Sequence, residues 1–380
     1  MPHDGCRTAE RSGPVGRAQS PSRLMGFDRP MASPIRDPAL ERLDDAACRA
    51  AIRVGSRSFH AASLMLPAET RRDALALYAF CRVSDDLVDE PEASGSIPER
   101  PTARLIRRLD GAYGGDPDDH WADRAFARAV TKHAIPYAVP RALIEGFEWD
   151  EAERRYETIA DLHAYGTRVA ATVGVMMTLV MGCRDPHVLA RACDLGLAMQ
   201  LTNIARDVGE DARAGRIYLP LAWLREEGVE PSEFVGEPIH DERIARVVER
   251  LLAEAARLYR RAETGIGGLP SNCRPAIAAA LGIYRDIGRD IARAEHDSVS
   301  RRARTTAGRK LLLAARAGGR RFRAPPMDRT PPMPQVRELI EAVEAAAIDP
   351  VRPRPGRAGR AIEILGALTE RERADQRATV

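Results

Sequence analysis

The chain has 380 residues, of which 44% are hydrophobic and 30% charged, so it can bury a sizeable core beneath a charged surface. These proportions exclude a mostly disordered chain, a collagen-like repeat and a small disulfide-stapled protein. Basic residues number 58, acidic residues 55, and aromatics only 5%, so neither a basic footprint nor stacking platforms for nucleic acid are expected.

The first 40 residues are predicted to be a disordered tail. Residues 1–40 contain six Pro, four Gly and six Arg and show no hydrophobic period. Such a segment buries too little apolar surface to offset the entropy lost on ordering. It also lacks the apolar stretch of a secretory signal, so we expect a cytoplasmic protein whose six scattered cysteines stay reduced.

Residues 41–322 are predicted to form one all-α domain. Apolar residues recur there at three- and four-residue steps, strand-like alternation is missing, and Gly- and Pro-rich stretches separate segments of helical length. The longest uncharged run, Val169–Cys183, has 15 residues, whereas a membrane span needs about 20. We therefore expect a buried core helix at this run and no transmembrane segment.

The first polar face lies on a helix predicted around residues 77–90. Tyr78, Arg82, Asp85 and Asp89 fall within about 60° of arc at 3.6 residues per turn, and Asp86 stands beside them. Most of their neighbours are apolar. A polar stripe on an otherwise apolar helix points into a cavity or to water.

The second polar face lies on a helix that is mainly apolar upstream. Gln200, Asn203, Asp207 and Asp211 share a narrow arc there. A glycine and a proline shortly downstream predict the end of this helix and the start of a loop.

Together, the two faces indicate a diphosphate site. Carboxylates at i and i+4 on two facing helices form sets of hard oxygen ligands, which Mg²⁺ prefers. Arg82 and Arg206 add donors for phosphate oxygens. One such face alone is more typical of a solvated helix. Two faces, neither balanced by a lysine one turn away, favour a metal–diphosphate site.

The last part of the chain, residues 323–380, is predicted to be a Pro- and Arg-rich appendage. Its first prolines are typical of an extended linker. Residues 335–347 show the pattern of a short amphipathic helix, and no function is assigned to the segment.

The two acidic motifs resemble the signature regions of the squalene/phytoene synthase family, in particular its members from phototrophic proteobacteria. The likeness covers about residues 47–316 and includes Gly55–Phe59, Tyr165–Gly174 and Ser300–Arg304. It implies the isoprenoid-synthase type of fold, a single-domain helical bundle around a deep apolar cavity, with both aspartate motifs facing each other near the mouth. Gly166 and Ala171 depart from the residues usual in the family, and we expect them to change the shape of the cavity.

The resemblance also implies a role for each matching residue. Five aspartates would hold the metal ions and, through them, the diphosphate: Asp85, Asp86, Asp89, Asp207 and Asp211. The substrate-binding set is Ser56, Ser58, Phe59, Tyr78, Arg82, Gln200, Asn203, Arg206 and Tyr284. Tyr165 would lie near the reacting carbons and act in catalysis with Asp85, Asp89, Asp207 and Asp211. Without the family, several of these residues are equally or more typical of purely structural positions: Ser58 as a helix cap, Tyr165 and Tyr284 as core tyrosines, and Arg301, Arg302 and Arg304 as a solvated basic face.

The implied activity is that of a prenyltransferase in carotenoid biosynthesis. Two molecules of geranylgeranyl diphosphate would condense head to head, through prephytoene diphosphate, to phytoene. The implied cofactor is Mg²⁺, with Mn²⁺ as a substitute, and NADPH is not expected. The apolar product implies peripheral contact with the inner face of the cell membrane and hand-over to a phytoene desaturase. Two alternatives stay open: a squalene or dehydrosqualene synthase that uses the C15 substrate, and a non-catalytic family member that acts as an assembly protein.

Overall fold

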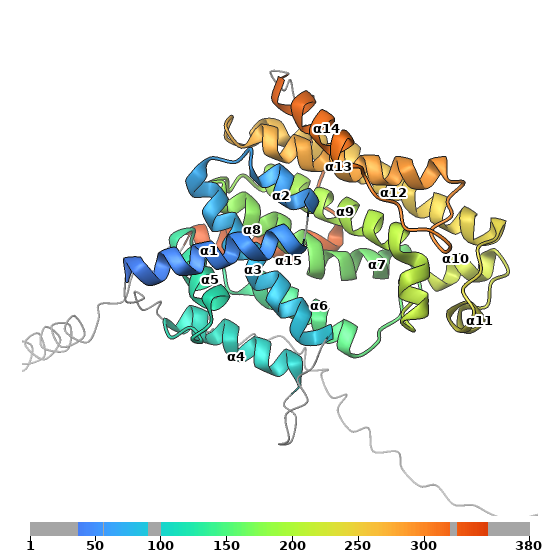
Figure 1. The fold of residues 1–380 in the computed structure, drawn as a ribbon, viewed down its shortest axis with the longest axis horizontal. Coiled ribbons are helices and arrows are strands. Elements are labelled where there is room, and N and C mark those ends of the chain that lie inside the picture. The colour runs from blue at the N-terminus through green and yellow to red at the C-terminus, as the bar shows by residue number, and fades with distance from the viewer. Residues whose placement is uncertain (1–36, 56, 90–99, 320–324, 349–380) are drawn as a thin grey trace, which may run out of the picture.

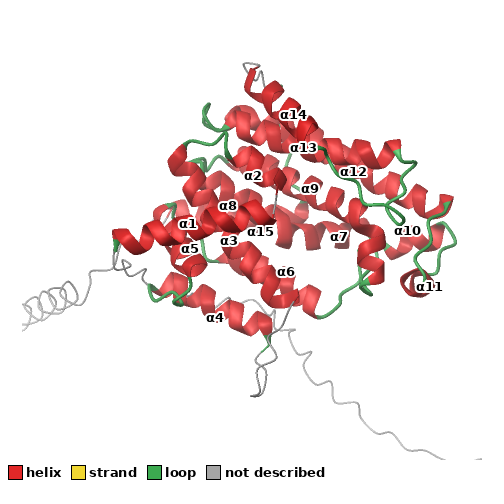
Figure 2. Ribbon diagram, viewed as in Figure 1, coloured by secondary structure: helices red, strands yellow, loops and turns green. Residues whose placement is uncertain are grey.

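The computed structural model describes residues 37–55, 57–89, 100–319 and 325–348 (Figure 1). Every regular element in these ranges is a helix, and Figure 2 shows helices joined by loops. The all-α prediction is therefore confirmed. Of the tail expected at residues 1–40, residues 1–36 lie outside the described residues, whereas residues 38–40 form the start of the first helix. The chain beyond residue 348 also lies outside the described residues.

The first half of the bundle consists of α1 (Pro38–Gly55), α2 (Arg57–Ser63), α3 (Ala68–Asp89), α4 (Pro101–Gly114), α5 (Trp121–Lys132) and α6 (Ala138–Glu151). Buried Phe80 of α3 stacks on Phe126 of α5, with 3.9 Å between ring centroids. A buried ion pair of 2.8 Å joins Arg108 of α4 to Asp123 of α5. Because the two opposite charges pair with each other, α4 and α5 can bury both side chains where the helices pack.

The middle of the chain forms α7 (Ile159–Gly166), a five-residue π-helix η1 (Thr167–Ala171), α8 (Thr172–Val180) and α9 (Pro186–Arg213). The Asp185 carboxylate caps α9 by accepting the backbone N–H groups of His187 and Val188. Gly196 of α9 lies against η1, where an added Cβ would stand 2.5 Å from the carbonyl oxygen of Ala170. A residue without a side chain is needed for this approach, which brings the π-helix and α9 into contact.

The second half contains α10 (Leu221–Glu226), α11 (Pro231–Gly236), α12 (Glu242–Gly265), the 3₁₀ turn η2 (Ile266–Gly268), α13 (Arg274–Arg293) and α14 (Ala307–Gly319). The buried side chains of α12 recur at three- and four-residue steps, among them Val247, Val248, Leu251 and Leu258. This stripe faces α9, which also contacts α8 and α13 and so forms the centre of the bundle.

The uncharged run Val169–Cys183 is the end of η1 followed by α8, whose Val175 and Met176 are fully buried. No helix among the described residues is long and apolar enough to cross a bilayer.

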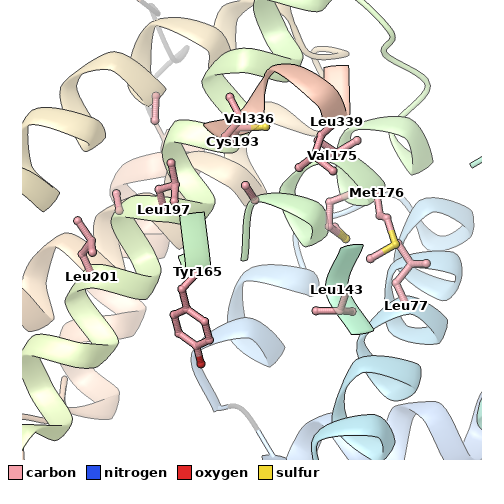
Figure 3. Packing of buried hydrophobic residues seen from close by; sticks show 14 of the residues in the cluster. Leu77, Leu143, Tyr165, Val175, Met176, Cys193, Leu197, Leu201, Val336 and Leu339 are labelled. Atoms are coloured by element: carbon pink, nitrogen blue, oxygen red, sulfur yellow. The ribbon is translucent and has the colours of Figure 1, made fainter. Parts of the chain in front are cut away.

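The segment expected to be an appendage is partly built into the core. After residue 324 the chain runs through η3 (Pro334–Val336) into α15 (Arg337–Ile348), where the predicted short helix lies. Val336, Leu339, Ile340 and Val343 are at most 5% exposed. In Figure 3, Val336 lies near Cys193 of α9, and Leu339 near Val175 of α8. The proline-rich composition of the segment did not indicate that these four apolar side chains share one face and are buried.

Candidate active site

A cavity of about 520 Å³ lies inside the bundle, walled mainly by apolar side chains of α3, α6, α8, α9, α12 and α13. Eight predicted site residues line it: Phe59, Tyr78, Arg82, Asp85, Tyr165, Gln200, Asn203 and Tyr284. Its wall follows α9 from Asn203 back to Val188, a distance of about 22 Å at 1.5 Å per residue. The cavity is therefore long, with most of its polar groups gathered at one end and Arg191 in the wall at the other.

The first acidic face lies at this polar end. The Arg82 guanidinium, 44% exposed, donates to Asp86 at 3.1 Å and pairs with Asp85 at 3.4 Å. Tyr78 stacks on Phe59, with 5.4 Å between the ring centroids. Burial raises the pKa of the Tyr78 hydroxyl to about 12, so it stays protonated at neutral pH. Gly55, the last residue of α1, approaches this hydroxyl so closely that a Cβ would stand 2.3 Å from its oxygen.

The second acidic face divides between the cavity and its rim. Gln200 and Asn203 line the cavity, whereas Asp207 lies outside the lining, held by two arginines. Arg206 donates to the Asp207 carboxylate at 2.8 Å and Arg302 donates to it at 2.7 Å. Arg302 also pairs with Glu210 at 3.0 Å. Arg82 and Arg206, the arginines expected to meet phosphate, thus contact the chain's own carboxylates in this structure.

Arg302 reaches α9 because its loop can approach that helix closely. An added Cβ on Gly209 would stand 2.3 Å from the carbonyl oxygen of Val299, and the Gly209 N–H donates to Ser298 at 2.9 Å. Arg302 lies within the part of the sequence that resembles the family. From the sequence alone, it was predicted only to belong to a solvated basic face. Its partner lies 95 positions away in the chain, and no local pattern reveals such a contact.

Asp211 faces a small separate hollow beside Tyr218 and Phe234. Burial first, then the charges of Asp207 and Glu210, raise the pKa of this carboxyl to about 7. Carboxylates this close to one another suit a bound cation, because a cation would stabilise the ionised forms of the carboxylates. Among the described residues, no three metal-ligating side chains are gathered closely enough to hold an ion by themselves.

Asp150 is a site residue that the sequence patterns did not reveal. This carboxylate of α6 lines the cavity and accepts hydrogen bonds from Tyr165 and Tyr218, each at 3.0 Å. Burial raises its pKa to about 6, helped by the charge of Asp85 and opposed by the two tyrosine hydroxyls and by Arg216. Asp150 is one of four acidic residues in the second half of α6, with Glu145, Glu148 and Glu151, and no repeated motif distinguishes it from the other three.

Tyr165 is 4% exposed and belongs to a stack of tyrosines. Its ring centroid lies 5.0 Å from that of Tyr156 and 5.3 Å from that of Tyr218. The tyrosine therefore has both a fixed ring and a fixed hydroxyl partner, Asp150, at the wall of the cavity.

The two departures from the family pattern lie away from the cavity lining. A Cβ on Gly166 would stand 2.9 Å from a methyl carbon of Leu197 on α9, and Ala171 is fully buried. Their neighbours Val169 and Ala170 form the wall. Residue size at position 166 thus acts on the contact between the end of α7 and α9, and residue size at position 171 acts on the contact between η1 and α9.

Three predicted residues cannot be placed. Ser56 lies outside the described residues, and the described part of the chain does not include the side chains of Ser58 and Asp89.

Comparison with known proteins accords with this geometry. A profile of the squalene/phytoene synthase family matches residues 52–309. Phytoene synthases of Cereibacter sphaeroides and Rhodobacter capsulatus are each 49% identical, over 86% and 81% of this chain and 94% and 92% of theirs. The fold matches a crystal structure of a dehydrosqualene synthase with a TM-score of 0.67 and 29% identity, over 74% of this chain and 98% of that one. With a profile matching more than half of its length and relatives this similar, the chain belongs to the squalene/phytoene synthase family.

Proposed function

We propose that the chain is a phytoene synthase, a prenyltransferase that joins two molecules of geranylgeranyl diphosphate head to head. One observation carries the proposal: acidic faces of α3 and α9 flank one end of a long apolar cavity. Acidic groups suit a metal-bound diphosphate, and the apolar part suits a prenyl chain. The 49% identity to phytoene synthases favours the C20 substrate over the C15 substrate.

Asp85 and Asp86 on α3, with Asp207 and Asp211 on α9, would hold Mg²⁺ or Mn²⁺. When bound, the metal neutralises charge that develops on the departing diphosphate. The donor set is all oxygen, as hard cations require, and water and phosphate oxygens usually complete their coordination.

The chain's own residues bind, orient and shield the substrate. Arg82, Arg206 and Arg302 carry guanidinium groups at the polar end, where they can exchange a carboxylate partner for a phosphate. The apolar wall excludes water, which would otherwise quench the allylic cations of this reaction. Asp150 orients the Tyr165 hydroxyl at the cavity wall.

A product assay tests the proposal. The purified chain is incubated with Mg²⁺ and either the C15 or the C20 prenyl diphosphate, without NADPH, and the hydrocarbon is identified by mass. A C40 product from the C20 substrate alone is expected. A C30 product would assign the chain to the C15-using branch. Absence of any hydrocarbon from folded, metal-loaded protein would favour the non-catalytic assembly protein.

We also propose peripheral contact with a membrane, from which the apolar product could pass to a desaturase. Leu311 and Leu312 on α14 are 72% and 44% exposed and directly follow Arg309 and Lys310. Exposed apolar residues beside basic ones suit an anionic lipid surface. Flotation with anionic vesicles should recover the chain, and Leu311→Glu should reduce the recovered fraction. Equal recovery with and without lipid would contradict this proposal.

A further inference from the structure

At the end of the cavity farthest from the acidic faces, the wall contains a buried arginine. Arg191 lies on α9, twelve residues before Asn203, and only 1% of its side chain is exposed. Its stem packs on Gly265 at the end of α12, where a Cβ would stand 2.3 Å from the Arg191 Cβ. The mechanism proposed above gives this charge no role.

The Arg191 guanidinium is held by residues 325–336, which we call the C-terminal strap. It pairs with the Asp328 carboxylate at 2.9 Å and donates to the Asp328 carbonyl oxygen at 3.1 Å and to the Thr330 hydroxyl at 3.2 Å. Its Nε lies 2.8 Å from the carboxylate of Asp194. The strap thus completes the ion pairing of a charge in the cavity wall.

The strap also joins the two helices that meet at this end. Arg261 of α12 donates to Asp194 of α9 at 3.0 Å and to the carbonyl oxygen of Pro331 at 3.3 Å. The hydroxyl of Thr264, also on α12, accepts the N–H of Asp328 at 3.1 Å. The strap therefore bridges α9 and α12 at a point where the two helices also contact each other directly.

Apolar contacts extend this closure. An added Cβ on Gly268 would stand 3.0 Å from the Met327 methyl carbon and 2.4 Å from a methyl carbon of Val188. Val188 lines the cavity, as do Ile266 and Leu269 on either side of Gly268. Met327 therefore packs beside Val188 against the turn that forms part of the distal wall. The whole strap lies beyond residues 52–309, the span matched by the family profile.

We propose that the C-terminal strap, clasped by Arg191, closes the distal end of the cavity and sets the longest prenyl chain that the enzyme accepts. This inference rests on the proposed function, in which a prenyl chain occupies the cavity with its diphosphate at the acidic end. A chain one isoprene unit longer must push against the closed end. Removing the ion pair between Arg191 and Asp328 allows α9, α12 and Met327 to move apart, and the longer chain then fits.

The test compares substrates in variants of the full chain. The kcat/KM values of the C20 diphosphate and its C25 homologue are measured for the wild type, Asp328→Ala and Asp328→Asn. An apolar pocket lowers the kcat/KM of a substrate that does not fit it by about tenfold or more. We expect Asp328→Ala to raise the C25-to-C20 ratio by about tenfold with C20 turnover retained, and Asp328→Asn, which keeps the shape of the side chain, to raise it less.

Glu227→Ala is the matched control. Its carboxylate is partly buried like that of Asp328 and accepts a bond from Arg246 at 2.7 Å, but it lies between α10 and α12 and does not line the cavity. The control should leave the ratio unchanged. An unchanged ratio in Asp328→Ala, or an equal fall for both substrates, would overturn the proposal. If the wild type makes no C40 hydrocarbon from the C20 substrate, the proposed function fails instead.

A second measurement uses the wild type and requires no turnover. A C20 diphosphate analogue with a photoreactive diazirine on its terminal isoprene unit is bound with Mg²⁺ and irradiated. The label should appear in peptides that contain residues 186–195, 262–269 or 325–333. Label confined to other peptides would place the chain end elsewhere and refute the closing role of the strap.

Discussion

Replacing Asp150 with Asn should make the protein more stable and less active. Burial raises the pKa of this carboxyl from 3.8 to about 6. Each pKa unit corresponds to about 1.4 kcal/mol, so keeping the group ionised in the folded chain costs about 3 kcal/mol at neutral pH. Asn has nearly the same shape and no charge. The variant should therefore gain up to about 3 kcal/mol in the free energy of unfolding.

The gain should depend on pH in a defined direction. The unfolded chain ionises Asp150 near pH 4 and the folded chain only near pH 6. The free energy of unfolding of the wild type therefore decreases as pH rises from about 4 to about 6. The variant lacks the carboxyl and should not show this decrease. Urea unfolding with EDTA at pH 4 and at pH 8 measures the difference. Asp110→Asn is the control, because Asp110 also accepts a tyrosine hydroxyl, that of Tyr137 at 2.8 Å, but lies outside the cavity.

Turnover should move in the opposite direction. A hydrogen bond to a charged group contributes about 1.5–3 kcal/mol, so weaker orientation of Tyr165 should lower kcat by about 10- to 100-fold. A variant whose stability relative to wild type is the same at pH 4 and pH 8 would refute the electrostatic reasoning. Unchanged kcat would refute the orienting role of Asp150.

Other expected outcomes concern the metal site, acid stability and packing. Asp207→Ala should lower kcat by about 10²- to 10³-fold while circular dichroism shows a retained fold, because charge stabilisation of the leaving group is lost. Dialysis against EDTA should abolish hydrocarbon formation, and added Mg²⁺ should restore it. Burial alone would raise the pKa of Glu254, but hydrogen bonds from Arg257 and His163 lower it to about 2 from 4.5. The wild type should thus lose up to about 3 kcal/mol as pH falls from about 4.5 to 2, and Glu254→Gln should not show this loss in urea titrations. Gly196→Val should lower stability by about 1–3 kcal/mol, seen as a lower Tm, because its side chain collides with the π-helix.

The features predicted correctly from the sequence depend on the spacing of residues within a single helix. Helix period places Tyr78, Arg82 and Asp85 on one face, and the structure finds all three on the cavity wall. The same argument places Gln200 and Asn203 there. It could not show that Asp207 would be covered by arginines, because a helical wheel contains no information about side chains from other elements.

The features that were missed depend on contacts between distant segments. Asp150 gains its importance from Tyr165 and Tyr218, and the second of these lies 68 positions away. The strap was judged by its prolines, whereas its place in the fold is set by Arg191, 137 positions before Asp328. Composition describes how a segment behaves alone, and these segments are defined by their partners.

The arginines on the acidic faces have a consequence for how ligands bind. Arg82 and Arg206 each pair with a neighbouring aspartate, and Arg302 bridges to Asp207 from a loop. In the proposed function, a substrate that arrives with its metal would exchange one set of ion pairs for another: the arginines would pair with phosphate, and the carboxylates would hold the metal. The affinity is then the small difference between two large electrostatic terms. Binding at this site should accordingly be readily reversible, which suits an enzyme that must release diphosphate in every cycle.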